Sequence, residues 1–194
     1  MIKGKFIVIE GIDGCGKSTL IENLRKHFSD AVFLREPTNG QFGTVIRKKL
    51  SSDDILNADE MLELFLSDRA EDCEVNIFPA LKSGKNVIMD RYYYSNAAYQ
   101  GAMGLDCREI IKNNINRGFA VPDAVLYLDI TPVEALKRIR SRSLDSEQYE
   151  KLSFLEKVDS IYKKIADDKY FFIDGNLSAE MVLQQALKKL GEIL

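Results

Sequence analysis

The chain has 194 residues, a length that favours one domain, and 45% of them are hydrophobic, which is enough for a sizeable core. Its 27 basic residues are slightly outnumbered by 30 acidic ones, giving a net charge of −3. A general nucleic-acid-binding surface is therefore not expected, and any anion must be bound by basic residues gathered locally.

Cysteine usage and hydropathy limit the class of protein further. Cys15, Cys73 and Cys107 form no CxxC pair, so we expect packing roles in a reducing cytoplasm rather than a disulfide framework or a zinc site. We find no signal-peptide pattern and no run of about 18 apolar residues, so no membrane segment is expected.

In the first part of the chain, short apolar runs alternate with segments of helical spacing. Pro79 makes the end of the longest helical pattern uncertain. We predict strands over residues 6–9 and 31–34, and helices over 18–28, from about 45 to 50, and 58–81.

The same alternation continues to the end of the chain. A polar, charge-dense stretch over 138–151 separates two helical segments and is the candidate for a short lid at about 140–150. We predict strands over 87–89, 124–128 and 170–173. Helices are predicted over 92–101, 106–117 and 178–190, with one more beginning at 131 and another, after the polar stretch, ending at 165.

This alternation predicts an α/β fold, a three-layer sandwich of the P-loop NTPase type, in which helices cover both faces of a five-stranded parallel sheet. We expect residues 1–194 to form a single domain. Ligands of such folds bind beyond the carboxyl ends of the strands. The predicted strands end in charged residues, which places a site at that edge: Glu10, Arg35 with Glu36, Asp90 with Arg91, Asp129 and Asp174.

Residues 11–18, GIDGCGKS, fit the P-loop pattern G-x-x-x-x-G-K-[ST] between a predicted strand and a predicted helix. Backbone N–H groups of such a loop surround phosphates, Lys17 can reach the β- and γ-phosphates, and the Ser18 hydroxyl can bind Mg²⁺. The alternative is a nucleotide binder that transfers no phosphate. The residues predicted to bind ATP here are Gly11, Ile12, Asp13, Gly14, Cys15, Gly16, Lys17, Ser18 and Thr19.

Asp90 and Arg91 follow the third apolar strand. The carboxylate of Asp90 is placed to approach the metal, and Arg91 can bridge the donor and acceptor phosphates during transfer. A strand-end salt bridge is the alternative. A GTPase would need an N-K-x-D motif, which is absent, so a nucleotide kinase is favoured.

Six stretches in order resemble the thymidylate kinase family over nearly the whole chain. They are FIVIEGIDGCGKST, REP at 35–37, LFLSDRAE at 64–71, DRYYYSNAAYQG at 90–101, PDAVLYLD at 122–129 and FFIDGN at 171–176. The resemblance implies that the enzyme uses ATP and Mg²⁺ to convert dTMP to dTDP and forms a homodimer through the helices at 58–81 and 92–101. Another deoxynucleotide or nucleoside kinase, or a non-catalytic P-loop module, stays as the alternative.

Spacing places the acceptor residues on two helices. Phe65 and Arg69 are four apart and share a face, and the resemblance implies that they stack on thymine and donate to its carbonyl. Core packing for Phe65 and a surface ion pair for Arg69 are the alternatives. The resemblance also implies a base contact for Asn96 and a ring under the sugar for Tyr99, with Gln100 on the same helix.

The resemblance gives roles to residues near the first two strands as well. Asp13 is expected to contact the acceptor's sugar hydroxyl or the Mg²⁺ shell. Arg35 is expected to hold the acceptor phosphate, with Glu36 and Pro37 shaping the loop around it. A salt bridge between Arg35 and Glu36 is the alternative.

The chain departs from the family at the catalytic arginine, which lies either in the P-loop or in the lid. The P-loop position is Cys15, and in the lid Ser146 stands where the second arrangement would place its arginine. Arg138 and Arg142, four apart, are the candidates to close over the donor phosphates; a solvated helix face is the alternative.

Overall fold

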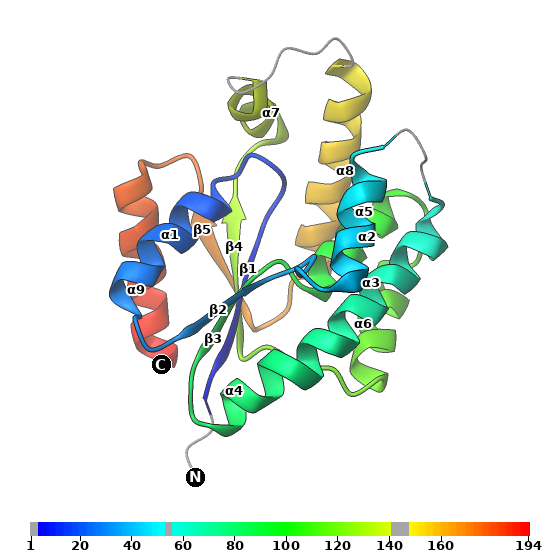
Figure 1. Cartoon of the computed structure of the whole chain (residues 1–194). Helices are drawn as coiled ribbons and strands as arrows, with labels where there is room; N and C mark the ends of the chain where they lie inside the picture. Colours follow the sequence, from blue (N-terminus) through cyan, green and yellow to red (C-terminus); the bar gives the residue numbers. More distant parts are fainter. Residues whose placement is uncertain (1–3, 53–55, 141–147) are drawn as a thin grey trace.

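A computed structural model describes residues 4–52, 56–140 and 148–194 of the chain. Its strands form one sheet with the order β2-β3-β1-β4-β5, and every neighbouring pair runs parallel (Figure 1). The predicted parallel α/β fold is confirmed. The strands are β1 (Phe6–Glu10), β2 (Val32–Arg35), β3 (Val87–Asp90), β4 (Ala124–Asp129) and β5 (Tyr170–Asp174).

Burial explains why the strand segments are continuous apolar runs. β1 and β3 are buried along their whole length and β4 along all but its last residue, whereas the edge strands β2 and β5 are only partly buried. Central strands of a parallel sheet have helices on both faces, so both sets of side chains must be apolar.

Helices cover both faces of the sheet. Figure 1 shows α1 and α9 together on one side, and α3, α5, α6 and α8 on the other. The helices of the described residues are α1 (Lys17–His27), α2 (Gln41–Leu50), α3 (Ala58–Asp72), the π-helical turn η1 (Cys73–Ile77), α4 (Phe78–Lys82), α5 (Tyr93–Ala102), α6 (Cys107–Asn116), α7 (Pro132–Arg140), α8 (Gln148–Ile165) and α9 (Ala179–Ile193).

The helix predicted over 58–81 is not one regular helix, because the π-turn η1 divides it into α3 and α4. In this wider turn the Phe78 N–H donates to the Cys73 carbonyl, five residues back. Pro79 follows, and its ring would crowd the carbonyl of residue 75 in a regular α-helix. The chain therefore stays helical through the proline instead of ending before it.

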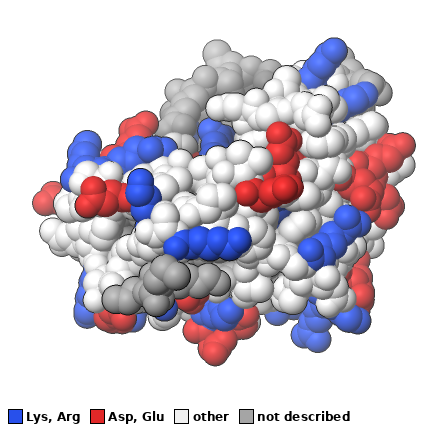
Figure 2. Space-filling model, turned by 60° about the horizontal axis from the view of Figure 1, so that its bottom comes forward, with Lys and Arg blue, Asp and Glu red and all other residues white. Residues whose placement is uncertain are grey.

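The strand register gathers the charged strand ends at one edge of the sheet. Asp90 is paired with Ile9 on one side and with Arg35 on the other, and Asp129 is paired with Asp174. Among the described residues, the helices are all too short or too polar to cross a membrane. Basic and acidic side chains are interspersed on the face shown in Figure 2.

Candidate functional site

The loop between β1 and α1 bends through glycines with positive φ angles. Gly11, Gly14 and Gly16 have φ values of 145°, 84° and 104°. A Cβ atom at Gly14 would lie 2.4 Å from the Ala135 carbonyl oxygen, so a larger residue would clash there. Helix α1 begins at Lys17, and its first backbone N–H groups have no intrahelical acceptor. The loop and helix end together favour a bound anion.

Lys17 is buried against the carbonyls of its own loop. Its Nζ donates to the carbonyl oxygens of Gly11 (2.8 Å) and Ile12 (3.1 Å), and it lies 3.5 Å from the Cys15 Sγ. Reaching the phosphates of a bound nucleotide requires the ammonium group to leave these carbonyls. The side chains of Ser18 and Thr19, by contrast, are exposed at the first turn of α1.

Asp13 joins the P-loop to α5. Its carboxylate accepts from Arg91 Nη2 (2.5 Å) and from the Tyr99 hydroxyl (3.0 Å), and the Arg91 guanidinium lies 5.3 Å from the centre of the Tyr99 ring. Burial opposes ionisation of Asp13, but the charges of Arg91 and Lys17 outweigh it and lower the pKa. A negative charge is thus held beside the P-loop, and Arg91 faces it.

Of the two alternatives for the strand-end charges, the salt bridge between Arg35 and Glu36 is wrong. A strand-end salt bridge does form, between Asp90 Oδ2 and Arg35 Nε (3.7 Å), whereas Arg91 forms its ion pair with Asp13. Arg35 is 69% exposed and Glu36 is buried in an ion pair with Arg69. Arg35 therefore keeps an accessible guanidinium at the pocket.

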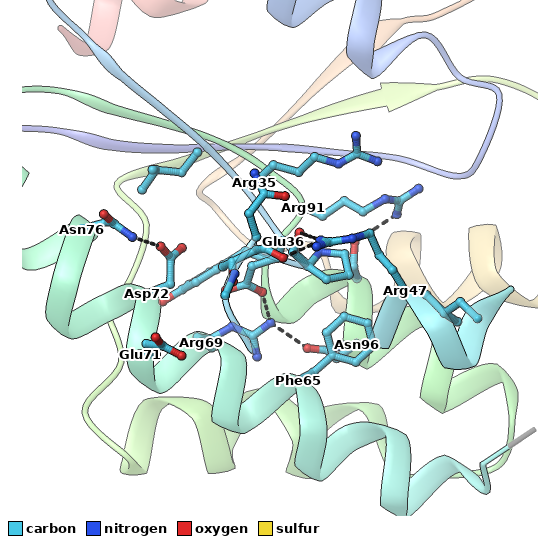
Figure 3. A pocket seen from close by; sticks show the side chains of 18 of the residues that line it. Arg35, Glu36, Arg47, Phe65, Arg69, Glu71, Asp72, Asn76, Arg91 and Asn96 are labelled. Carbon is cyan, nitrogen blue, oxygen red and sulfur yellow. Dashed lines mark hydrogen bonds and ion pairs between the residues drawn. The ribbon is translucent and has the colours of Figure 1, made fainter. Parts of the chain in front are cut away.

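A pocket of about 780 Å³ opens beside the P-loop, between β2, α2, α3 and α5 (Figure 3). Every residue predicted to bind the acceptor lines it, although those residues come from five separate parts of the chain. They are Asp13, Arg35, Glu36, Pro37, Phe65, Arg69, Arg91, Asn96, Tyr99 and Gln100.

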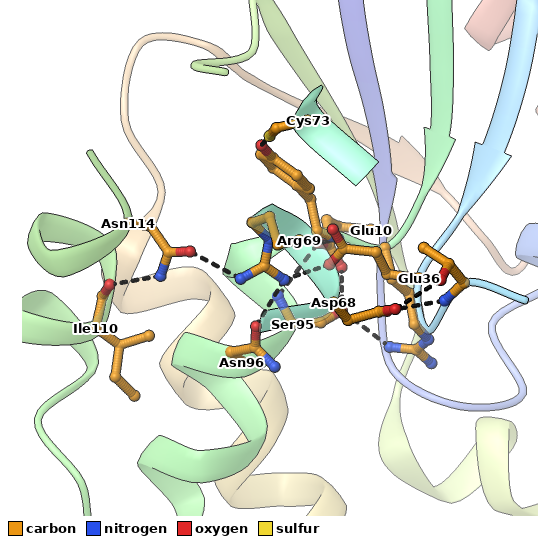
Figure 4. Close-up of polar contacts among 12 residues, drawn as sticks. Glu10, Glu36, Asp68, Arg69, Cys73, Ser95, Asn96, Ile110 and Asn114 are labelled. Carbon is orange, nitrogen blue, oxygen red and sulfur yellow. Dashed lines mark hydrogen bonds and ion pairs between the residues drawn. The ribbon is translucent and has the colours of Figure 1, made fainter. Parts of the chain in front are cut away.

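Arg69 lies in the floor of this pocket and is completely buried. Its Nη1 donates to Asn114 Oδ1 (2.7 Å), and its Nη2 donates to Asn96 Oδ1 (2.7 Å) and to the Glu36 carboxylate (Figure 4). The guanidinium also lies 4.8 Å from the centre of the Tyr92 ring. The alternative of a surface ion pair is wrong, because this arginine connects α3, α5, α6 and the loop after β2.

The ionisation of the Arg69–Glu36 pair is set by burial. Burial raises the pKa of Glu36 to about 8, although Arg69 opposes the shift. Burial also disfavours the charge of Arg69, but the Glu36 carboxylate outweighs it and raises the arginine pKa. Asn96 is held as well, since its Nδ2 donates to Gln100 Oε1 (3.1 Å).

The lid prediction is only partly within the described residues, and Arg142 lies outside them. Arg138, on α7, donates from Nη1 to the Gly175 carbonyl (3.0 Å) and lies 3.5 Å from Glu134. It therefore connects α7 to the loop after β5. A role in binding ATP stays a prediction for Arg138 and Arg142.

Known proteins with this sequence pattern identify the family. The family model for thymidylate kinase matches residues 9–186. The chain belongs to the thymidylate kinase family. It is 43% identical to the thymidylate kinase of Leptospira interrogans serovar copenhageni over 187 residues, 94% of this chain and 92% of the relative. It is 40% identical to the probable thymidylate kinase of Archaeoglobus fulgidus over 192 residues, 97% of this chain and 95% of the relative.

Asp90 and Ser18 are the residues predicted to bind Mg²⁺ in this thymidylate kinase family member. Asp90 Oδ1 is buried and has no hydrogen-bond partner among the described residues, and the Ser18 hydroxyl is exposed at the end of the P-loop. Magnesium bound with a nucleotide takes few protein ligands and completes its shell with phosphate oxygens and water. One carboxylate and one hydroxyl fit that requirement.

Several residues that shape this thymidylate kinase site were missed in the sequence. Asn114 binds Arg69, Asp68 accepts from the Thr38 N–H (2.8 Å) and hydroxyl (2.6 Å), and Ser95 accepts from Arg91 Nη1 (3.1 Å). Asp68 and Ser95 stood within the SDRAE and YYYSN stretches but had no spacing signal of their own. For Asn114, no local signal exists, because its partner lies 45 residues away.

Proposed function

We propose that this chain transfers the γ-phosphoryl group of ATP to dTMP, producing dTDP and ADP. The pocket carries the proposal, because it joins the P-loop directly to a nucleotide-sized space lined by four aromatic rings and five arginines. Phe65 offers a stacking surface for a base. Arg69 Nε is buried without a hydrogen-bond partner among the described residues, which suits a donor that a base carbonyl would satisfy.

The reaction needs positioning and charge neutralisation more than proton transfer, because the acceptor phosphate is already an anion. In this proposal Arg35 holds the acceptor phosphate, Lys17 holds the donor phosphates and Arg91 lies between them. Asp13 holds the Arg91 guanidinium through their ion pair. Mg²⁺ bound by Ser18 and Asp90 would neutralise charge on the ATP phosphates.

A coupled assay of ADP release tests the substrate directly. We expect dTMP to be preferred over dUMP, dCMP, AMP and GMP, with ATP as donor and with activity lost when EDTA removes Mg²⁺. The Arg91→Ala variant tests whether the activity comes from this site, and it should lose at least about a hundredfold in kcat. Equal turnover of all acceptors would refute the preference for dTMP, and no turnover at all would favour a binding module.

We also propose a homodimer in a reducing cytoplasm. Helix α5 is buried within its own chain over most of its length, so the surface left for a partner is mainly that of α3, η1 and α4, where Val75 is 62% exposed. All three cysteines are free and buried, as suits a reducing compartment. Sedimentation velocity at micromolar concentration tests the dimer, and a single monomer boundary would contradict it.

A further inference from the structure

The backbone of Arg91 is held in a conformation that residues with a side chain disfavour. Its φ angle is 65°, the only positive value among the non-glycine residues that the structure describes. It directly follows the last residue of β3 and precedes α5. A left-handed conformation at such a position persists only where neighbouring contacts enforce it.

Glu10 and Ile9, the last two residues of β1, supply those contacts. Glu10 Oε1 accepts from the backbone N–H of Tyr92 (2.8 Å) and of Ser95 (3.2 Å), and the Arg91 N–H donates to the adjacent Ile9 carbonyl (3.1 Å). The N-cap of α5 makes no side-chain hydrogen bond of its own, and its first turn has no acidic residue. A carboxylate from the neighbouring strand therefore caps the helix.

The second oxygen of Glu10 leads to the Arg91 side chain. Oε2 accepts from the Ser95 hydroxyl (2.7 Å) and from the Tyr162 hydroxyl on α8 (2.8 Å), and Ser95 Oγ accepts from Arg91 Nη1. Figure 4 shows Glu10 and Ser95 beside the Arg69 network. Glu10 therefore acts on Arg91 in two ways. It binds the backbone that directly follows Arg91, and it is connected through the Ser95 hydroxyl to the Arg91 guanidinium.

The burial of Glu10 indicates more than an ordinary helix cap. The side chain is fully buried, and burial raises its pKa, while the Arg91 charge and the bonds from Ser95, Tyr162 and Tyr92 oppose the shift. Four donors converge on its two oxygens, which matches the acceptor capacity of a carboxylate. A buried acid with no exposed surface contributes here by fixing its neighbours.

We propose that Glu10 is a positioning residue for phosphoryl transfer: it fixes the backbone and, through Ser95, the guanidinium of Arg91 between the two phosphate sites. This inference rests on the proposed function. It differs from a purely structural role in one respect, because the effect of Glu10 on turnover should pass through Arg91.

A double-mutant cycle separates the two roles. The isosteric Glu10→Gln variant keeps the shape but removes the charge, and we expect kcat at saturating dTMP and ATP to fall at least fivefold, since a displacement of about 1 Å can cost about a hundredfold. KM for ATP should change less than about twofold. In an Arg91→Lys background the same substitution should cost less than about twofold, because the group that Glu10 positions is already gone.

Tyr127→Phe is the matched control. It likewise disturbs one hydrogen-bonded carboxylate, because it removes the hydroxyl that donates to Asp159 on α8 (2.8 Å), but neither Tyr127 nor Asp159 is bonded to Arg91. We expect this variant to keep kcat within twofold. Should Glu10→Gln unfold at the assay temperature in circular dichroism, Ser95→Ala carries the test with the same fivefold threshold.

The inference is overturned if Glu10→Gln, or Ser95→Ala in its place, loses less than fivefold, or loses the same factor with arginine and with lysine at position 91. The Arg91 Nε–Hε signal in ¹⁵N NMR, assigned from its absence in Arg91→Lys, gives a readout without substrate. It should shift in Glu10→Gln and not in Tyr127→Phe; an unchanged signal overturns the inference. A wild-type chain inactive on dTMP refutes the proposed function alone.

Discussion

Replacing Arg69 by alanine is expected to destabilise the fold as well as to weaken dTMP binding. The side chain is completely buried, and its guanidinium is bonded to Glu36, Asn96 and Asn114. Removing it leaves a buried carboxylate without its cation and two buried amide oxygens without their donor.

The expected loss can be worked out from these contacts. Breaking one side of a buried ion pair costs about 3–5 kcal/mol, and a buried acceptor left without a donor costs about 1–3 kcal/mol. Burial raises the pKa of Glu36 to about 8 even beside Arg69, so the ion-pair cost applies in full above that pH, where Glu36 is ionised. The terms still overlap, because the carboxyl group can take up a proton once Arg69 is gone. We therefore expect a loss of about 4 kcal/mol, close to a thousandfold in the folding equilibrium.

Urea unfolding at pH 9, where Glu36 is ionised, measures this loss by far-ultraviolet circular dichroism, since the chain has no tryptophan. The control is Arg108→Ala, which removes an exposed arginine from α6 and should cost less than about 0.5 kcal/mol. The double variant Arg69→Ala, Glu36→Gln removes both charges with the same loss of volume and should regain at least half of the lost stability, while KM for dTMP stays raised.

Two results would refute this reasoning. A loss below about 1 kcal/mol for Arg69→Ala would mean that the ion pair contributes little to the fold. A double variant no more stable than the single one would mean that the cost arises from lost volume rather than from an unpaired charge.

Three further predictions follow from the same pocket. Asn114→Ala should cost about 2 kcal/mol in urea unfolding because it leaves Arg69 Nη1 without an acceptor, whereas the neighbouring Asn113→Ala should cost under about 0.5 kcal/mol; equal losses would contradict the network. Between pH 5 and 8 the folded chain keeps a proton on Glu36 that the unfolded chain has released, so wild-type stability should fall with rising pH relative to Glu36→Gln, and parallel curves would contradict the raised pKa. Phe65→Ala should raise KM for dTMP about tenfold with kcat within threefold, as lost stacking predicts; an unchanged KM would place the base elsewhere.

The P-loop could be predicted in full from the sequence because its residues are consecutive and their chemistry is local. Glycines at positions 11, 14 and 16 allow the positive φ angles, and Lys17 and Ser18 follow at fixed spacing. The strands were found because central strands of a parallel sheet must be apolar on both faces. The edge that carries the site followed from the parallel order.

Partner choice among the charged residues could not be predicted. Arg35 and Glu36 are adjacent in sequence, yet Arg35 ends β2 and Glu36 lies in the loop that follows, and they pair with Asp90 and Arg69 instead of with each other. Likewise, nothing local indicates that Glu10 caps a helix that begins more than eighty residues later.

The sequence by itself therefore determined the P-loop, the succession of strands and helices along the chain and the residue types that line the pocket. Only the tertiary structure decided which of those residues are buried in ion pairs and which are exposed to the pocket. The physical reason is that a buried charge takes its partner from whichever element packs against it, and that packing brings together Glu36, Arg69 and Asn114 across gaps of 33 and 45 residues.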